Sequence, residues 1–251
     1  MIDLNSLVAY TDSHLEADRF SDYCPNGLQV EGRREVRRVV SGVTASLALI
    51  EAAIEARADL LLVHHGYFWR GEDPRIVGPK QRRLGLLLGA RINLLAYHLP
   101  LDAHPLHGNN AQLAARLGLA VDGRFGPGEG GGIGMHGHSE TPFTGAEFAE
   151  HVRRVLGRSP LHVPGPGPVR TVAWCTGAAQ GLIDEAAQIG VDAYVTGEVS
   201  ERTVHVARES GIHFFAAGHH ATERYGVQAL GAHLAEQFDI EHRFIDIDNP
   251  A

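Results

Sequence analysis

The chain alternates between short apolar runs and longer segments in which apolar residues recur every three or four positions. Val36–Val43 and Asp59–Val63 are apolar runs typical of buried strands, and Ser46–Ala56 between them has helical periodicity. The pattern then predicts a helix at about Lys80–Leu88 and a strand at Ile92–Tyr97. Strands that alternate with helices in this way indicate right-handed βαβ units and a parallel sheet.

The second half of the chain repeats this order. Its predicted elements are the strand Val169–Cys175, the helix Leu182–Gln188, the strand Asp192–Val195, a helix at about Glu201–Glu209 and the strand Ile212–Ala217. The first and second strands are offset by 22 residues in both halves, from Val39 to Leu61 and from Val172 to Tyr194. We therefore predict an α/β protein with two duplicated, βαβ-containing domains.

The duplication predicts a first domain at residues 1–125 and a second at 126–251. A glycine-rich stretch at 126–132 is the expected hinge or turn between them. A further helix is expected at Ala221–Ala235, and it is a candidate to pack back on the first domain. The duplication also aligns His64-His65 with Gly197-Glu198, and the pair His98 and Asp102 with His219 and Glu223.

Composition and charge narrow the classes of function. The net charge is −8, with 30 acidic against 22 basic residues, which argues against a constitutive nucleic-acid binder. No apolar run approaches the roughly 18 residues of a membrane span, and the start lacks the pattern of a signal peptide. Only Cys24 and Cys175 occur, so a Cys-rich zinc site is excluded and a reducing cytoplasm is the expected location.

Sixteen histidines are the one compositional excess, and several follow predicted strands directly. His64 and His65 end the second strand of the first half, His98 and Asp102 follow the third, and His219 follows the corresponding strand of the second half. In open α/β sheets, ligands bind beyond the carboxyl ends of the strands. Glu223 lies four residues after His219, so a helix there places both side chains on one face.

Each of these signals also has an ordinary structural explanation. A pair of adjacent histidines can be a packed or surface pair, Asp102 can cap a helix, and His219 with Glu223 can be a helix-stabilising pair. Three coincidences at equivalent strand ends are less probable than one shared site. Singly scattered histidines are expected to have ordinary surface or core roles; these are His14, His151, His162, His205, His213, His233 and His242. Other histidines lie nearer the expected cleft and are candidates to orient ligands; these are His98, His104, His107, His136, His138 and His220.

The residue types limit the metal. Histidine nitrogens with Asp and Glu oxygens, and no thiolate, suit Zn, Fe(II) or Mn. With His98 set aside as a candidate to orient ligands, five candidate ligands remain at these strand ends. That number exceeds what one catalytic ion with an open position takes from a protein. We therefore expect two divalent ions in a cleft shared by the two domains, where a pair about 3.5–4 Å apart can polarise a substrate oxygen and activate water.

The same segments resemble a known family. Val63-His64-His65-Gly66, the stretch from Tyr97 to Asp102, Tyr194-Val-Thr-Gly197-Glu198 and the stretch from Ala217 to Arg224 are similar to motifs of the Nif-three-like proteins, the GTP cyclohydrolase I type 2 homologues. Pro25-Asn26-Gly27-Leu28-Gln29 is similar too, and the resemblance covers essentially the whole chain, in the compact bacterial form.

The resemblance implies a two-domain α/β fold with a dinuclear centre, often assembled as a ring-shaped hexamer. It assigns the ligands to His64, His65, Asp102, His219 and Glu223, with Glu223 as the bridge. It implies a metal-dependent hydrolase that acts on a nucleotide or a related heterocycle, with GTP as a candidate. His98 and Glu198 are then candidate proton shuttles.

Two alternatives remain. The ions can be cargo or structural, in a metal-binding chaperone, insertion factor or regulatory protein without turnover. A nucleic-acid clamp that uses the hole of a ring is the third hypothesis, and it requires a basic inner surface.

Overall fold

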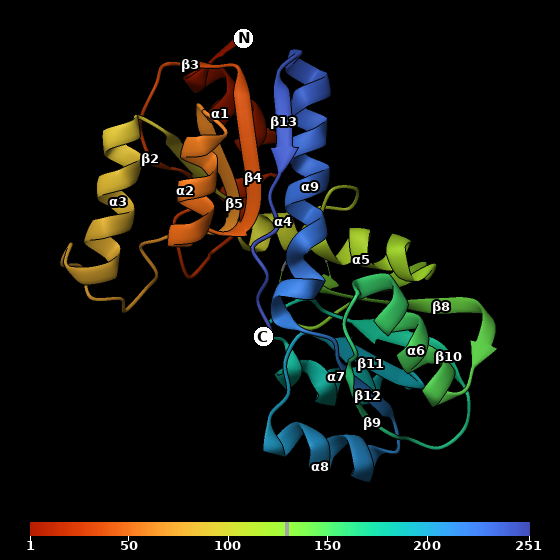
Figure 1. The fold of residues 1–251 in the computed structure, drawn as a ribbon. Coiled ribbons are helices and arrows are strands. Elements are labelled where there is room, and N and C mark those ends of the chain that lie inside the picture. Colours follow the sequence, from red (N-terminus) through yellow and green to blue (C-terminus); the bar gives the residue numbers. More distant parts are fainter. Residues whose placement is uncertain (129–130) are drawn as a thin grey trace. The chain divides into compact units, whose positions relative to one another are not determined.

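The chain folds into two compact units, each with its own sheet (Figure 1). The structure, a computed structural model, describes residues 1–128 and 131–251, so positions 129–130 of the expected glycine-rich hinge lie outside the described residues. Unit 1 comprises Met1–Gly108 and Gly226–Asp248, and unit 2 comprises Asn109–Tyr225 and Asn249–Ala251. The predicted mixed α/β class is confirmed.

The units divide the chain earlier than the boundary expected at residue 125. Helix α5 (Asn109–Leu117) and strand β7 (Ala120–Phe125) belong to unit 2, where β7 pairs with the next strand, β8 (Gly134–Phe143). Helix α9 (His219–Phe238) begins in unit 2 and continues into unit 1.

Unit 1 is built on a five-stranded sheet in the order β13-β4-β5-β6-β2. The strands are β13 (Glu241–Phe244), β4 (Arg38–Thr44), β5 (Leu60–His65), β6 (Asn93–Ala96) and β2 (Gly27–Val30). The first four are parallel to their neighbours, and β2 runs antiparallel to β6. A separate antiparallel pair joins β1 (Ile2–Asp3) to β3 (Glu35–Val36).

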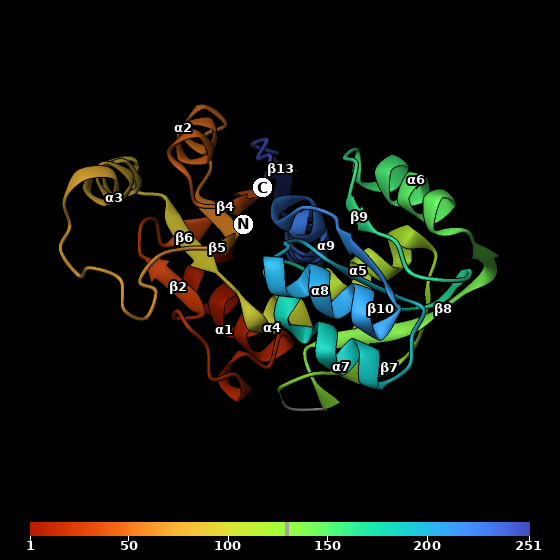
Figure 2. The same cartoon turned by 90° about the horizontal axis from the view of Figure 1, so that it is seen from below.

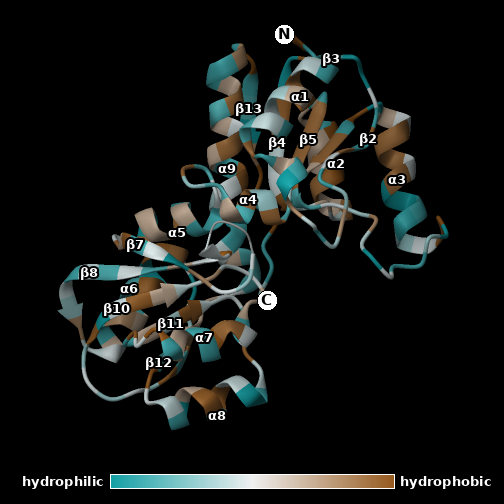
Figure 3. Cartoon of the chain, turned by 180° about the vertical axis from the view of Figure 1, so that it is seen from behind, coloured by the Kyte–Doolittle hydropathy of each residue, from teal (hydrophilic) through white to brown (hydrophobic). Residues whose placement is uncertain are grey.

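Helices cover both faces of this sheet, as Figure 2 shows. Helices α2 (Leu47–Glu55) and α3 (Gly78–Ala90) pack on one face, and α1 (Leu4–His14) and the later turns of α9 pack on the other. The alternation along β5 explains this arrangement, because Leu61 and Val63 contact the first pair of helices and Leu60 and Leu62 the second. Strand β5 and helix α2 are accordingly hydrophobic in Figure 3. Two short helices complete the unit, η1 (Ala17–Arg19) and α4 (Leu99–Ala103).

Unit 2 has a six-stranded sheet in the order β7-β8-β10-β11-β12-β9. Strands β10 (Val169–Trp174), β11 (Ala193–Thr196) and β12 (His213–Ala216) are parallel, and β7, β8 and β9 (Leu161–Val163) pair antiparallel to their neighbours. Helices α5 and α6 (Gly145–Leu156) pack on one face, and α7 (Ile183–Gln188), after the short η3 (Gln180–Leu182), and α8 (Glu201–Ser210) pack on the other.

The internal repeat extends to individual hydrogen bonds. Asp59, just before β5, accepts the backbone N–H groups of Arg37 and Arg38 at 3.0 and 3.1 Å. Asp192, just before β11, accepts those of Arg170 and Thr171 at 3.0 and 2.7 Å, with the same sequence separations. In both units one carboxylate thus ties the start of the first long parallel strand to the start of the second.

The repeat is offset by one residue at the third strand. Val63 pairs with Ala96 in unit 1, and the equivalent Thr196 pairs with Ala216 in unit 2. Counting forward from those pairs, the counterpart of His98 is Gly218, so the alignment of His98 with His219 is off by one residue.

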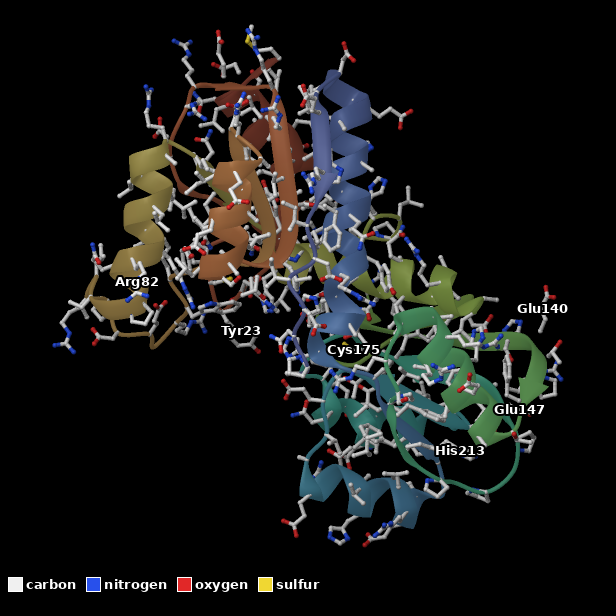
Figure 4. All side chains as sticks on the ribbon, in the orientation of Figure 1. Tyr23, Arg82, Glu140, Glu147, Cys175 and His213 are labelled. Atoms are coloured by element: carbon white, nitrogen blue, oxygen red, sulfur yellow. The ribbon has the colours of Figure 1, made fainter. Side chains whose placement is uncertain are left out.

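Two further expectations concern membrane spans and cysteines. Among the described residues, no helix has the length and apolarity needed to cross a membrane. Cys24 and Cys175 are both buried and form no disulfide, as expected of a chain without a disulfide framework, and Cys175, labelled in Figure 4, belongs to the core of unit 2.

The Asp192 carboxylate should contribute measurably to stability. Burial opposes its charge, but the backbone N–H groups of Thr171 and Arg170 and the Thr171 hydroxyl outweigh burial and hold the pKa of Asp192 below its ordinary 3.8. We expect Asp192→Asn to lower the free energy of unfolding at pH 7 by about 1 kcal/mol, because bonds to a charged acceptor contribute roughly 1.5–3 kcal/mol and solvent screens this half-buried site.

Because the folded pKa is depressed, this contribution is present above about pH 4 and is lost as the pH falls through the folded pKa. Denaturant unfolding at pH 7 and in acid measures the difference between the variant and the parent. The control is Asp184→Asn, which removes an exposed ion pair with Arg202 at 2.7 Å and should cost less than about 0.5 kcal/mol. An equal loss in both variants, or a difference independent of pH, would contradict the assignment.

Candidate functional site

The carboxyl end of β5 presents a fully buried imidazole. The Nδ1–H of His64 donates to the backbone carbonyl of Tyr97 at 2.9 Å, which fixes the ring's orientation and its tautomer. The Nε2 atom of His64 lies 3.5 Å from Oδ1 of Asp102, which is also buried. An imidazole with one nitrogen held by an acceptor and the other beside a carboxylate is the usual arrangement of a metal ligand.

Asp102 reaches this position because β6 is followed at once by the short helix α4. The backbone N–H of Asp102 donates to the carbonyl of His98 at 3.1 Å, closing one helical turn. The turn therefore carries a carboxylate back toward the strand end, one helical turn beyond His98. The helix cap considered from the sequence is not its role, because Asp102 lies inside the helix.

The edge strand β2 and the residues just before it hold the ends of β5 and β6. The Gln29 side chain accepts the N–H of Tyr67 at 2.7 Å and donates to the carbonyl of Pro25 at 2.8 Å. Gly66 lies so close to Gln29 that a Cβ there would be 2.2 Å from its Oε1 atom. Only glycine fits, so the chain can turn directly after His65.

His98 is held by a carboxylate that no sequence motif marks. Its Nδ1 lies 2.7 Å from Oδ1 of Asp22, and Asp22 also accepts the N–H of Leu99 at 2.9 Å and the Asn26 amide at 3.0 Å. Burial opposes the charge of Asp22, but the hydrogen bond and the attraction of His98 lower its pKa to about 2. Asp22 is therefore ionised at neutral pH.

Three histidines gather at this edge of unit 1. Ligand nitrogens of His64, His65 and His98 lie within 4.8 Å of one another. Cys24 forms a further candidate group with Asp22 and His98, and burial and the Asp22 carboxylate raise the pKa of its thiol to about 12. Imidazole and carboxylate are the commonest donors at this edge, and the predicted ligands His64, His65 and Asp102 are among them.

In unit 2, the ends of three parallel strands approach one another at backbone distance. Gly197, after β11, donates its N–H to the carbonyl of Gly177, after β10, at 2.9 Å. A Cβ on Gly197 would lie 2.6 Å from both the Gly177 carbonyl oxygen and the Cα of His219. Glycine at this position lets β11 and β12 deliver Glu198 and His219 side by side.

His219 sits between two carboxylates. Its Nδ1 lies 2.7 Å from Oε1 of Glu198, and its Nε2 lies 3.1 Å from Oε2 of Glu223, one turn along α9. Burial alone would lower the pKa of His219, but the hydrogen bonds and charges of Glu223 and Glu198 raise it to about 9. Glu223 is buried, and Glu198 is partly exposed.

The two units thus present the same kind of donor set, and this set fits a divalent metal. In each unit an imidazole has Nδ1 bound to an oxygen acceptor and Nε2 beside a carboxylate oxygen. His64, His65 and Asp102 would supply the ligands of unit 1, and His219 and Glu223 those of unit 2. That all five hold one dinuclear centre stays a prediction.

The sequence pattern does not reveal the groups that orient these ligands. Asp22, Asn26 and the Tyr97 carbonyl hold His98 and His64, and Glu198 holds His219. That Glu198 also carries protons stays a prediction. The Pro25–Gln29 segment carried a signal, because its similarity to the family marked it without giving a role. Nothing in the pattern marks Asp22, which lies in the irregular segment between η1 and β2.

The amino-acid sequence is similar to a family model and to known bacterial proteins over essentially its whole length. The family model Duf34/NIF3 (NGG1p interacting factor 3) matches residues 2–250. A Pseudomonas aeruginosa protein named GTP cyclohydrolase 1 type 2 homolog is 63% identical over 250 residues, which cover 100% of this chain and 99% of that protein. An Allochromatium vinosum protein of the same name is 55% identical over 252 residues, covering 100% and 98%.

Solved structures agree with the fold. The protein ybgI, described as of unknown function, has a TM-score of 0.96 and 52% identity, and the match covers 100% of both chains. The protein TTHA1606 from Thermus thermophilus has a TM-score of 0.89 and 38% identity, again over 100% of both chains.

Gly177 offers a way to displace Glu223 without changing any ligand. A Cβ on Gly177 would lie 2.0 Å from Oε1 of Glu223, and its φ is +70°. Gly190 has a similar φ of +77° with nothing within 4 Å of its Cβ. We expect both Gly→Ala variants to lose about 1 kcal/mol of stability, and only Gly177→Ala to bind divalent metal at least about 10-fold more weakly. Calorimetric titration with Zn²⁺ measures the affinities, and equal affinities would show that Glu223 is not a ligand.

Proposed function

This chain belongs to the Duf34/NIF3 family, and we propose that it is a hydrolase that depends on two divalent metal ions and acts on a nucleotide or a related heterocycle. One observation carries the metal part of the proposal. Each of His64 and His219 has its Nδ1 engaged by an oxygen acceptor and its Nε2 beside a buried carboxylate, of Asp102 and Glu223 respectively. An imidazole whose orientation is fixed at Nδ1 and whose Nε2 lies beside a carboxylate is the arrangement that metal-binding histidines adopt.

The proposed ligands are His64, His65, Asp102, His219 and Glu223, with Glu223 bridging. When bound, a pair of Zn, Fe or Mn ions supplies Lewis acidity and lowers the pKa of a bound water. The Tyr97 carbonyl and the Glu198 carboxylate fix the orientation of the two rings, so each Nε2 faces the place that an ion would take, and at His219 the ion would displace the Nε2 proton that the raised pKa retains. Glu198 in this arrangement positions His219, and it is also a proposed proton carrier because its carboxylate is partly exposed.

His98 is the proposed proton carrier. Asp22 accepts from its Nδ1, so Nε2 is the nitrogen that exchanges a proton with substrate or water. Asp22 stabilises the imidazolium once it forms, which is the role of the carboxylate in other carboxylate–histidine pairs. The ring lies near His64 and His65, with ring centroids 5.1 and 5.8 Å away.

Aromatic side chains beside His98 support a planar heterocyclic substrate. Trp69 packs edge-on against His98 with ring centroids 5.0 Å apart, and Tyr23 lies 6.3 Å from it and is 60% exposed. Tyr23 is labelled in Figure 4. An exposed aromatic ring beside a ligand cluster is a stacking surface for a base. The GTP of the relatives' name is the first member of this class to test.

Homo-oligomeric assembly, as a hexameric ring, is also part of the proposal. It rests on the family resemblance, and native mass spectrometry of the full chain tests it. A monomer at micromolar concentration would remove this part and leave the metal chemistry untouched.

The decisive experiment couples metal content to turnover. Protein purified without added metal should contain about two ions of one element per chain by elemental mass spectrometry. The variants Asp102→Asn and Glu223→Gln should lose metal and turnover together in a nucleotide panel that includes GTP. Glu140→Gln, an exposed carboxylate change labelled in Figure 4, should retain both. His98→Gln should retain metal and lose turnover by about 100-fold or more.

Metal without turnover on any nucleotide would overturn the hydrolase proposal and favour the chaperone or regulatory alternative. The rate of exchange then decides between cargo and a structural ion, because cargo should pass readily to a competing apo-protein. Absence of metal in the parent protein would remove the basis of both.

A further inference from the structure

A second group of histidines lies in unit 1, apart from the proposed ligands. His14 ends α1, His104 directly follows α4, His107 lies in the next turn, and His233 is on α9. The sequence pattern gives no reason to group His14 with His233, yet the fold brings all four rings together. The ring centroids of His14 lie 4.6, 5.1 and 4.4 Å from those of His104, His107 and His233.

The turn after α4 is built to hold two of these rings. The Nδ1 atom of His104 accepts the backbone N–H of His107 at 2.9 Å, and the N–H of Gly108 donates to the carbonyl of His104 at 3.0 Å. A Cβ on Gly108 would lie 2.3 Å from that carbonyl oxygen. Glycine therefore lets the turn close, and His104 and His107 stack at 5.2 Å with an interplanar angle of 10°.

The fourth ring, that of His233, holds the others in place. It stacks on His14 and His107, with centroids 4.4 and 4.6 Å away, and its Nε2 lies 2.8 Å from the Tyr10 hydroxyl. Since one nitrogen of His233 is engaged by the Tyr10 hydroxyl, we count this ring as a packing partner of the cluster and not as a ligand. The three remaining histidines each offer a nitrogen, and these atoms lie within 4.8 Å of one another.

We propose that His14, His104 and His107 form a second metal site, which takes one borderline divalent cation such as Zn²⁺. Three imidazoles with an open fourth position are a known arrangement for zinc. The site has no carboxylate ligand, so it should favour Zn²⁺, Ni²⁺ or Cu²⁺ over Mn²⁺ and Mg²⁺, which prefer oxygen. The proposal is independent of the proposed function, because none of its ligands belongs to the first centre.

The cluster has a solvent route and a suitable charge state. His14 and His104 line a cavity of about 460 Å³ together with Pro100, Ala103 and Pro105, which leaves room for a water or an exogenous ligand. Burial and repulsion from His233 lower the pKa of His14, and burial with repulsion from His233 and His14 lowers that of His107. His14 also lies at a helix C-terminus, where a positive charge is stabilised.

Metal binding requires a local adjustment. Zn–N distances of about 2.0–2.1 Å place tetrahedral ligand nitrogens about 3.3 Å apart, closer than the 4.8 Å limit within which these atoms lie. His14 Nε2 and His107 Nδ1 are already 3.0 Å apart, joined by one hydrogen bond that the ion would replace. His104 must turn its ring or give up the bond from His107 N–H, and its half-buried position permits either.

The test uses the full chain stripped of metal and titrated with Zn²⁺ by calorimetry. In an Asp102→Asn/Glu223→Gln/His65→Gln background, which removes both carboxylates and one imidazole of the first centre, one Zn²⁺ per chain should still bind. Adding His14→Gln and His107→Gln should abolish that equivalent. The matched control is His205→Gln, an exposed histidine on α8, which should leave it unchanged. Unchanged Zn²⁺ binding in the His14/His107 variant would overturn the proposal.

A second measurement guards against misfolding of the variant. In the wild-type chain, Zn²⁺ should shift the imidazole ¹⁵N resonances of His14, His104 and His107 together and leave that of His205 in place. Absence of these shifts at saturating Zn²⁺ would overturn the site even if every variant failed to fold. If Asp102→Asn/Glu223→Gln loses bound ions but His14→Gln/His107→Gln loses none, this site is rejected and the proposed function stands. The opposite pattern would reject the proposed function and leave this site standing.

Discussion

A histidine packed at the end of a strand needs a partner for each ring nitrogen, and this requirement organises both units, at the buried His64 and at the half-buried His219. His64 satisfies Nδ1 with the Tyr97 carbonyl, and His219 satisfies it with Glu198. The second nitrogen, Nε2, then faces a carboxylate in each case. Leaving a buried ring nitrogen without a partner costs about 1–3 kcal/mol, so the orientation of each ring follows from the backbone and side chains around it.

The same requirement explains why the surrounding backbone is so compact. Gly66, Gly177 and Gly197 each lie where a Cβ would collide with Gln29, Glu223 or the backbone of His219. These glycines let strand ends approach closely enough for one side chain to reach another across the sheet edge. The carboxylate clamps of Asp59 and Asp192, at the opposite ends of the strands, are shared by both units, whereas the groups at the ligand ends differ. The two units therefore share the frame, whereas the acceptor at Nδ1 is a backbone carbonyl for His64 and a carboxylate for His219.

Much of the frame could be predicted from the sequence because it depends on periodicity. Predicted strands such as Asp59–Val63 and Ile212–Ala217 correspond to β5 and β12 within two residues, since apolar runs bounded by polar turns are a local signal. The parallel pairing of β13 with β4 joins residues about two hundred positions apart and has no such signal. Asp22 and Tyr10 could not be assigned roles either, because they act through hydrogen bonds that only the tertiary fold creates. The His14 cluster was missed for the same reason, since its members come from three separate segments.

The segment from His98 to Gly108 contributes residues to both histidine groups. Within eleven residues it supplies His98 and Asp102 to one group and His104 and His107 to the other. Helix α4 has only five residues, so its internal hydrogen bonds alone hold it weakly. Its order depends instead on the Asp22 carboxylate at its start, which accepts the N–H of Leu99, and on the glycine-closed turn at its end. Both groups therefore depend on the order of the same short helix, which positions Asp102 for one group and leads directly into His104 of the other.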